Sequence, residues 1–159
     1  MADNTRIKVA KDKAYLVQSL TAADTTTGPF ETYADVLAFA ATLGIKHKRR
    51  VPLLGEVSKR DPSPIHRETF SAKGYDMVLN LIALADSGDP KTLASNEACS
   101  AERVQAFEEY ANGGLEVLEE VLKGTVDNLE QILLFLSANR LNSVPEDAEF
   151  NLSSFLTHS

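Results

Sequence analysis

Apolar residues recur at intervals of three and four along most of this chain, which is the spacing of helices with one buried face. The clearest run begins at Glu31 and ends at Leu43, where Gly44 is a natural helix terminator. The same spacing predicts further helices over residues 12–20, 74–86, 100–112, 115–122 and 127–139. Between the helices predicted at 100–112 and 115–122, the pair Gly113-Gly114 is expected to break or bend the chain.

The remaining segments read as loops, with one exception at the N-terminus. Residues 5–9 alternate polar and apolar side chains, which predicts a short strand and the only credible β element. Residues 51–64 show no sustained period and predict an exposed loop, since they contain Pro52, Gly55, Pro62 and Pro64. A turn is predicted at residues 87–90, where serine and glycine precede aspartate and proline.

Length and composition agree with one helical domain. The chain has 159 residues, of which 43% are hydrophobic, enough for an ordinary core. We therefore expect a mainly α, compact single-domain bundle of five or six helices with one short N-terminal strand, spanning residues 1–140. Residues 141–159 form a polar tail, expected to be mobile or weakly docked. No apolar run is long enough for a membrane helix and no secretory signal is visible, so we expect a cytoplasmic protein without a membrane partner.

The net charge of −7 conceals a division of the chain into two halves. Residues 1–75 carry 12 Lys and Arg against 8 Asp and Glu, whereas residues 76–159 carry 4 against 15. The helical domain thus has a basic half, 1–75, and an acidic half, 76–140. A polyanion would be tolerated only by the first half, and a basic protein partner would fit the second.

The densest basic segment is the "basic block", residues 46–50, which consists of Lys46, His47, Lys48, Arg49 and Arg50. Such a run is costly to bury and should stay solvated. One interpretation is a helix end whose cations complement the helix dipole. The other is a surface that faces the phosphates of a nucleic acid. Lys59, Arg60 and Arg67 follow nearby.

The N-terminal strand offers a second nucleic-acid hypothesis. Its alternation turns Ile7 and Val9 inward and Arg6 and Lys8 outward together. A strand followed by two helices is the order of a ribbon-helix-helix module, which needs a partner strand from a second protomer. The alternative is an edge strand with incidental charges. The full set of candidate DNA-binding residues is Arg6, Lys8, Lys46, Lys48, Arg49, Arg50, Lys59, Arg60 and Arg67.

Enzyme chemistry finds little support in the sequence. The three histidines are scattered and none is paired with a second ligand at helical spacing, so His66 with Glu68 is only a weak metal candidate. Cys99 has no basic neighbour that would activate it. The glutamates of residues 108–120 are expected to be solvated helix faces. We expect no catalytic residues, no metal and no cofactor.

Three blocks of the sequence resemble a known family. The first is GPFETYADVLAFAA (28–41) running into GIKHKRRVP (44–52); the second is ETF (68–70) with GYD (74–76) and ALADSGDP (83–90); the third is FEEYANGGL (107–115). In combination, over residues 5–136, they resemble the dnd system-associated protein 4 family, also called DNA phosphorothioation-associated protein 4. Residues 55–64 and the tail after Ser137 depart from that pattern.

The resemblance implies a context rather than a mechanism. Such proteins accompany the bacterial machinery that replaces a non-bridging phosphate oxygen of DNA with sulfur, and the linked restriction functions that serve antiviral defence. The leading hypothesis is a non-enzymatic accessory protein of this modification-restriction system. It would bind the backbone of duplex DNA through the basic half and other proteins of the system through the acidic half, with a homo-oligomer left open. The alternatives are a protein–protein adaptor without DNA contact and a small DNA-processing enzyme with an unrecognised carboxylate site.

Overall fold

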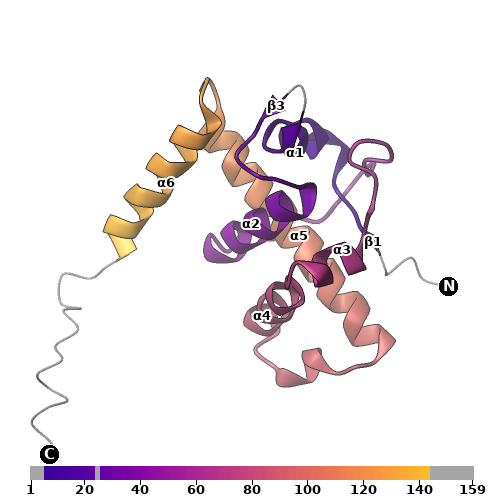
Figure 1. The fold of residues 1–159 in the computed structure, drawn as a ribbon. Helices are drawn as coiled ribbons and strands as arrows, with labels where there is room; N and C mark the ends of the chain where they lie inside the picture. The colour runs from indigo at the N-terminus through magenta and orange to yellow at the C-terminus, as the bar shows by residue number, and fades with distance from the viewer. Residues whose placement is uncertain (1–5, 24–25, 144–159) are drawn as a thin grey trace, which may run out of the picture.

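The computed structural model describes residues 6–23 and 26–143, and these fold into the mainly helical domain that the sequence predicts (Figure 1). The long helix α5 runs through the domain, and the shorter helices pack around it. Residues 141–143 belong to the last helix, and the rest of the predicted tail lies outside the described residues. The helices are α1 (Ala14–Ser19), α2 (Tyr33–Lys46), α3 (Arg67–Ala72), α4 (Asp76–Ser87), α5 (Glu97–Leu122) and α6 (Asn128–Ser143), with two 3-10 turns, η1 (Lys11–Lys13) and η2 (Pro90–Leu93).

Helix α2 begins where the sequence places it, because its first turn carries a capping box. The Thr32 side chain accepts a hydrogen bond from the Asp35 backbone N–H, and the Asp35 carboxylate accepts one from the Thr32 backbone N–H. Two otherwise unpaired donors are thereby satisfied. The helix then buries a row of small and branched residues against α5, among them Val36, Leu37 and Ala40.

Two expectations about glycine are wrong. Helix α2 does not end at Gly44 but continues to Lys46, and Gly113-Gly114 does not break the helix that contains it. Instead, α5 runs without interruption for 26 residues. A glycine costs up to about 1 kcal/mol inside a helix relative to alanine, so something must offset the loss at each position.

The compensation is the close crossing of α2 and α5. A Cβ atom on Gly44 would lie 2.0 Å from the Tyr110 carbonyl oxygen, and one on Gly114 would lie 1.7 Å from the Ala40 carbonyl oxygen. Neither distance is tolerable for a real side chain. The glycines therefore let the two backbones touch, which brings the apolar faces of both helices into contact. We call this contact the glycine crossing.

The core lies where α2, α4 and α5 meet, with the N-terminal segment packed on one side. The Phe70 ring of α3 meets the Phe107 ring of α5 edge-on, with 5.5 Å between centroids. Such pairs contribute about 0.5–1.5 kcal/mol beyond their burial. The other large side chains that are fully buried come from six segments and are Ile7, Val17, Leu20, Val36, Leu37, Pro62, Leu79, Leu115 and Leu118.

The N-terminal strand exists, but its partner lies in the same chain. Strand β1 (Arg6–Ile7) pairs antiparallel with β4 (Ile65–His66). Ile7 is buried and Arg6 is exposed, as the alternation predicts. Since β1 is already paired with β4 of the same chain, it does not form the intersubunit ribbon of a ribbon-helix-helix module. The expectation of a single β element is also wrong, because β2 (Ala22–Ala23) and β3 (Thr26–Thr27) form a second small antiparallel pair.

The predicted loop over residues 51–64 is irregular but not exposed throughout. The Ser58 backbone N–H donates to the Val9 carbonyl at 2.7 Å, and the Lys11 N–H donates to the Glu56 carbonyl at 2.9 Å. Ser58 is buried and so is Pro62. These hydrogen bonds fix the middle of the loop to the N-terminal segment.

Among the described helices, none is both long enough and apolar enough to cross a membrane.

Replacing Gly114 with alanine shows whether this glycine is merely tolerated in α5 or is required by the close approach of α2. If Gly114 were merely tolerated in the helix, alanine would raise the free energy of unfolding by about 1 kcal/mol. Because its Cβ would collide with the Ala40 carbonyl, we expect Gly114→Ala to lower that free energy by more than about 2 kcal/mol. Urea unfolding followed by circular dichroism measures the sign, and any stabilisation would contradict the close approach.

Candidate functional site

The basic block leaves α2 through a left-handed residue. Lys48 has a φ of 52°, a backbone conformation that residues other than glycine rarely adopt. The Arg49 backbone N–H then donates to the Gly44 carbonyl at 2.8 Å, which caps the last turn of the helix. The Arg49 carbonyl itself lies against Gly113, where a Cβ atom would be 1.9 Å away. The glycine crossing therefore fixes where the basic block turns.

Arg50 is bound by a network of partners that are more buried than the arginine itself. Its Nε donates to the Glu109 carboxylate of α5, and its Nη1 lies 2.7 Å from Asp86 Oδ2 at the end of α4. The guanidinium also lies over the Tyr110 ring, 5.8 Å from the centroid. The Tyr110 hydroxyl donates to the same Asp86 at 2.6 Å. Burial and this hydrogen bond raise the pKa of Tyr110 to about 12.

Arg49 makes a weaker and more exposed pair. Its Nη1 lies 3.0 Å from Glu120 Oε1, with the two side chains 35% and 67% exposed. Exposed pairs of this kind contribute about 1 kcal/mol or less, because water and salt screen them. A phosphate could therefore replace Glu120 at Arg49, whereas no ligand could displace both carboxylates from Arg50 at comparable cost.

Lys46 and Lys48 are the unpaired members of the block. Both side chains are exposed, and within residues 6–23 and 26–143 neither forms an ion pair. His47 between them stacks on Phe135 of α6, with 5.9 Å between ring centroids. The free lysines therefore lie at the end of α2 that adjoins α6. We call Lys46, Lys48 and Arg49 the α2-end cations.

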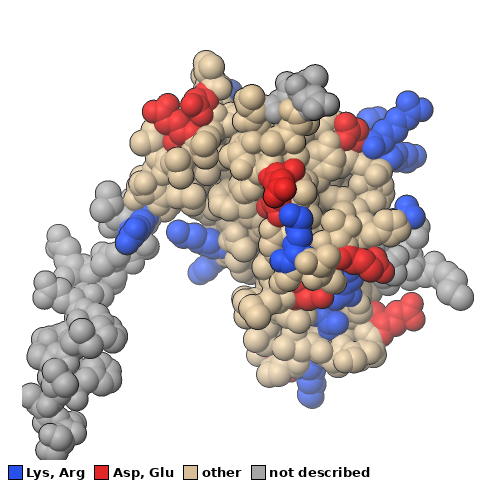
Figure 2. Space-filling view, in the orientation of Figure 1, with Lys and Arg blue, Asp and Glu red and all other residues tan. Residues whose placement is uncertain are grey.

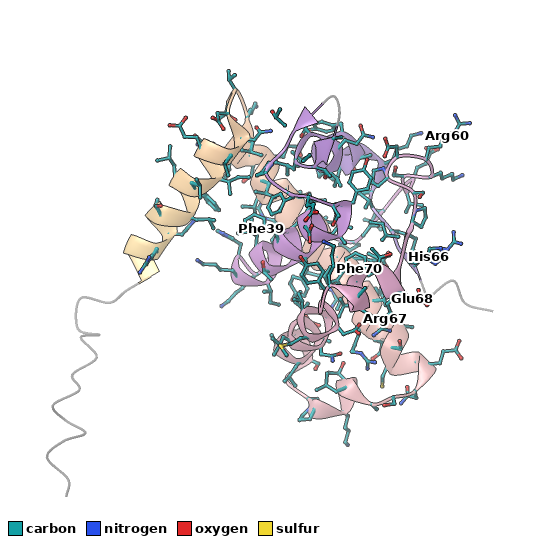
Figure 3. The ribbon with its side chains drawn as sticks, in the orientation of Figure 1. Phe39, Arg60, His66, Arg67, Glu68 and Phe70 are labelled. Carbon is teal, nitrogen blue, oxygen red and sulfur yellow. The ribbon has the colours of Figure 1, made fainter. Side chains whose placement is uncertain are left out.

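The other predicted residues lie elsewhere. Arg60 is at the tip of the 51–64 loop and points outward on the side away from α6 (Figure 3), and Lys59 beside it is also exposed. Arg67 opens α3, where its Nη1 donates to Ser100 Oγ at 2.5 Å and its Nε lies 3.8 Å from Asp76. Across the visible face, basic groups are scattered among acidic ones rather than gathered in one patch (Figure 2). The structure thus does not bring the nine candidates together.

Arg6 and Lys8 line an open hollow of about 420 Å³. Glu108 and Glu109 of α5 belong to the same lining. The expectation that both are solvated is wrong, because both are buried. Their partners explain the error: Glu108 Oε2 accepts the Lys8 backbone N–H at 2.7 Å, and Glu109 accepts from Arg50. These partners lie far away in the sequence, so helical spacing gave no signal of them.

The candidate metal ligands do not come together among the described residues. In residues 6–23 and 26–143, no three His, Cys, Asp or Glu side chains lie close enough together to hold a metal ion. His66 ends β4 and Glu68 lies in α3, without a third ligand beside them (Figure 3). His158 lies outside the described residues. Burial, reinforced by nearby Glu109, raises the pKa of Glu108, although the Lys8 N–H opposes the shift.

The difference between the ion pairs of Arg49 and Arg50 predicts different losses in the free energy of unfolding when each arginine is replaced by alanine. Arg50→Ala would leave Glu109 buried without its cation, and we expect a loss of about 2 kcal/mol in the free energy of unfolding. Arg49→Ala removes only an exposed pair, so less than about 1 kcal/mol should be lost. Urea titrations of both variants provide the comparison. Equal losses would contradict the structural role assigned to Arg50.

Glu108 should make stability depend on pH. An acid whose folded pKa is raised above its ordinary value of 4.5 binds more protons in the folded state, so this group lowers stability as pH rises above 4.5. Glu108→Gln removes the charge and keeps an acceptor for the Lys8 N–H. We expect this variant to be more stable than the parent at neutral pH, with the difference vanishing below that value. Unfolding measured from about pH 4 to about pH 8 tests this, and a pH-independent difference would contradict it.

Comparison with known proteins relates the whole domain to one family. The family model described as DNA sulphur modification system-associated protein 4 matches residues 6–155, nearly the full length. No match was found among curated proteins or among solved structures. The matched region includes the glycine crossing and the basic block, and the sequence blocks that resemble this family all lie inside it. The chain belongs to the family of DNA sulphur modification system-associated protein 4.

Proposed function

We propose that this chain is a non-enzymatic accessory protein that contacts the backbone of duplex DNA through the α2-end cations. Its acidic remainder would bind a basic surface of another protein of the sulphur modification system. The observation that supports this most is the pair of exposed lysines, Lys46 and Lys48, which no carboxylate neutralises within the described residues. Family membership supplies the context of modified DNA and its linked restriction functions.

The chemistry of the α2-end cations favours a backbone contact over base reading. Lysine is a flexible point charge, suited to a phosphate oxygen rather than to the paired acceptors of a base edge. Arg49 can exchange Glu120 for a phosphate at little cost, since their pair is exposed. No aromatic side chain alternates with these cations in the basic block, so stacking on single-stranded bases is not favoured.

The number of cations sets the strength that we expect. Three phosphate contacts predict a slope of about −2.7 for log affinity against log salt. Binding should therefore be measurable at low salt and weak at physiological salt. The carbonyl end of α2 and the net charge of −7 both oppose a polyanion, which keeps the affinity modest. Such a protein would need a partner of the system to hold it on DNA.

A salt series on fluorescein-labelled duplex DNA, read by anisotropy, tests the proposal. We expect the double variant Lys46→Ala and Lys48→Ala to reduce the slope by about 1.8, since two contacts are lost. The matched control is the double variant Lys59→Ala and Arg60→Ala, which removes the same charge on the side away from α6 and should leave the slope unchanged. Glu120→Gln should tighten binding by freeing Arg49.

Three results would overturn the proposal. Equal losses in the two double variants would mean that DNA senses only net charge. Absence of binding at low salt would favour the protein–protein adaptor. Plasmid cleavage that requires a divalent metal and stops with a chelator would favour the DNA-processing enzyme.

A further inference from the structure

Helix α6 leaves the domain with apolar side chains uncovered. It extends away from the body (Figure 1) and is attached on one face, where Ile132 is buried and Phe135 packs on His47 and the core. Around the helix from that face, Leu129 is 49% exposed, Leu133 54% and Leu136 37%. We call these three residues the α6 stripe. An exposed row of leucines on one helix marks an interaction surface.

The spacing of the α6 stripe is that of a helix pair. Residues 129, 133 and 136 are separated by four and then three positions, and the next position of that series is Arg140. Alternate steps of four and three form the seam of a two-helix coiled coil, in which each leucine enters a gap of the facing helix. The stripe therefore fits another amphipathic helix better than a flat surface or an irregular loop.

Charge decides which helix fits. The first turn of α6 and the residue before it are acidic, with Asp127 and Glu130, whereas the only cation between residues 127 and 143 is Arg140 near the other end. Two parallel copies would place Glu130 beside Glu130. Two antiparallel copies centred between Leu133 and Leu136 bring Glu130 of each helix next to Arg140 of the other, and also oppose the helix dipoles.

We propose that the α6 stripe is the interface of a homodimer, in which α6 pairs antiparallel with α6 of a second copy. The arrangement has two-fold symmetry, so Leu133 of each copy meets Leu136 of the other and Leu129 meets the aliphatic part of Arg140. It leaves the Phe135 face on the body of its own domain. The α2-end cations, which lie beyond that face, take no part in the interface.

Sedimentation equilibrium of the full chain tests the pairing. We expect a concentration-dependent dimer, and Leu133→Glu should raise its dissociation constant at least about a hundredfold, because a carboxylate would be buried at the seam. The matched control is Leu81→Glu on α4, a leucine that is 58% exposed on another face and should leave the dimer intact. A monomer at every concentration, or equal effects of both variants, would overturn the proposal.

A charge swap tests the direction of the pair. Glu130→Arg would set like charges together and weaken the dimer by about tenfold. Combining it with Arg140→Glu restores opposite charges across an antiparallel interface and should restore the dimer. In a parallel pair the swap restores nothing, so failure of the double variant to recover would overturn the antiparallel arrangement.

Disulfide trapping gives a readout that does not depend on stability. In a Cys99→Ser background, an oxidised mixture of Leu133→Cys and Leu136→Cys chains should form mixed disulfides in preference to disulfides between identical chains. A preference for identical chains would overturn the register. If the stripe is instead covered by residues 144–159 or by another protein of the system, the isolated chain will sediment as a monomer and form no preferred disulfide. Either result also overturns the homodimer.

Discussion

The contact on which the rest of the domain depends is the glycine crossing of α2 and α5. It brings two helices so close that a Cβ atom at Gly44 or Gly114 would lie within 2.0 Å of a carbonyl oxygen of the other helix. The apolar faces of the helices gain burial that outweighs the cost of glycine in a helix. The crossing also places the Arg49 carbonyl against Gly113, so it determines the direction in which the basic block leaves α2.

The opposite charges of the two halves of the chain form ion pairs that hold the halves together in the folded domain. Each of these ion pairs joins a cation from residues 1–75 to a carboxylate from residues 76–140: Lys13–Glu119, Arg49–Glu120, Arg50–Asp86, Arg50–Glu109 and Arg67–Asp76. Part of the basic charge that suggests a separate DNA-binding face is thus paired with carboxylates of α4 and α5. Within the basic block, the cations that stay available for a phosphate are the α2-end cations. Under the proposed function their number, not the total basic charge, sets the expected affinity.

The spacing of apolar residues is enough to predict most of the helices but does not indicate which residues of different helices are in contact. The runs at 31–43 and 127–139 were recognisable because their apolar residues repeat within one element. The sequence does not predict helix α3, because six residues with one buried side chain, Phe70, show no period. A glycine that breaks a helix and one that lets another helix approach are identical in sequence, since the difference lies in a residue such as Ala40, far from Gly114. The buried Glu108 and Glu109 were misjudged for the same reason.

A dimer through the α6 stripe would change what the α2-end cations can do. One copy offers at most three cations, against a helix C-terminus and an acidic chain. Because His47 stacks on Phe135, the end of α2 is fixed to α6, and pairing two α6 helices would therefore hold two such ends in one assembly. A second contact within an assembly costs less than the first, because the two ends are already tethered. Dimerisation is thus a physical route by which a weak, sparsely charged surface could hold a polyanion.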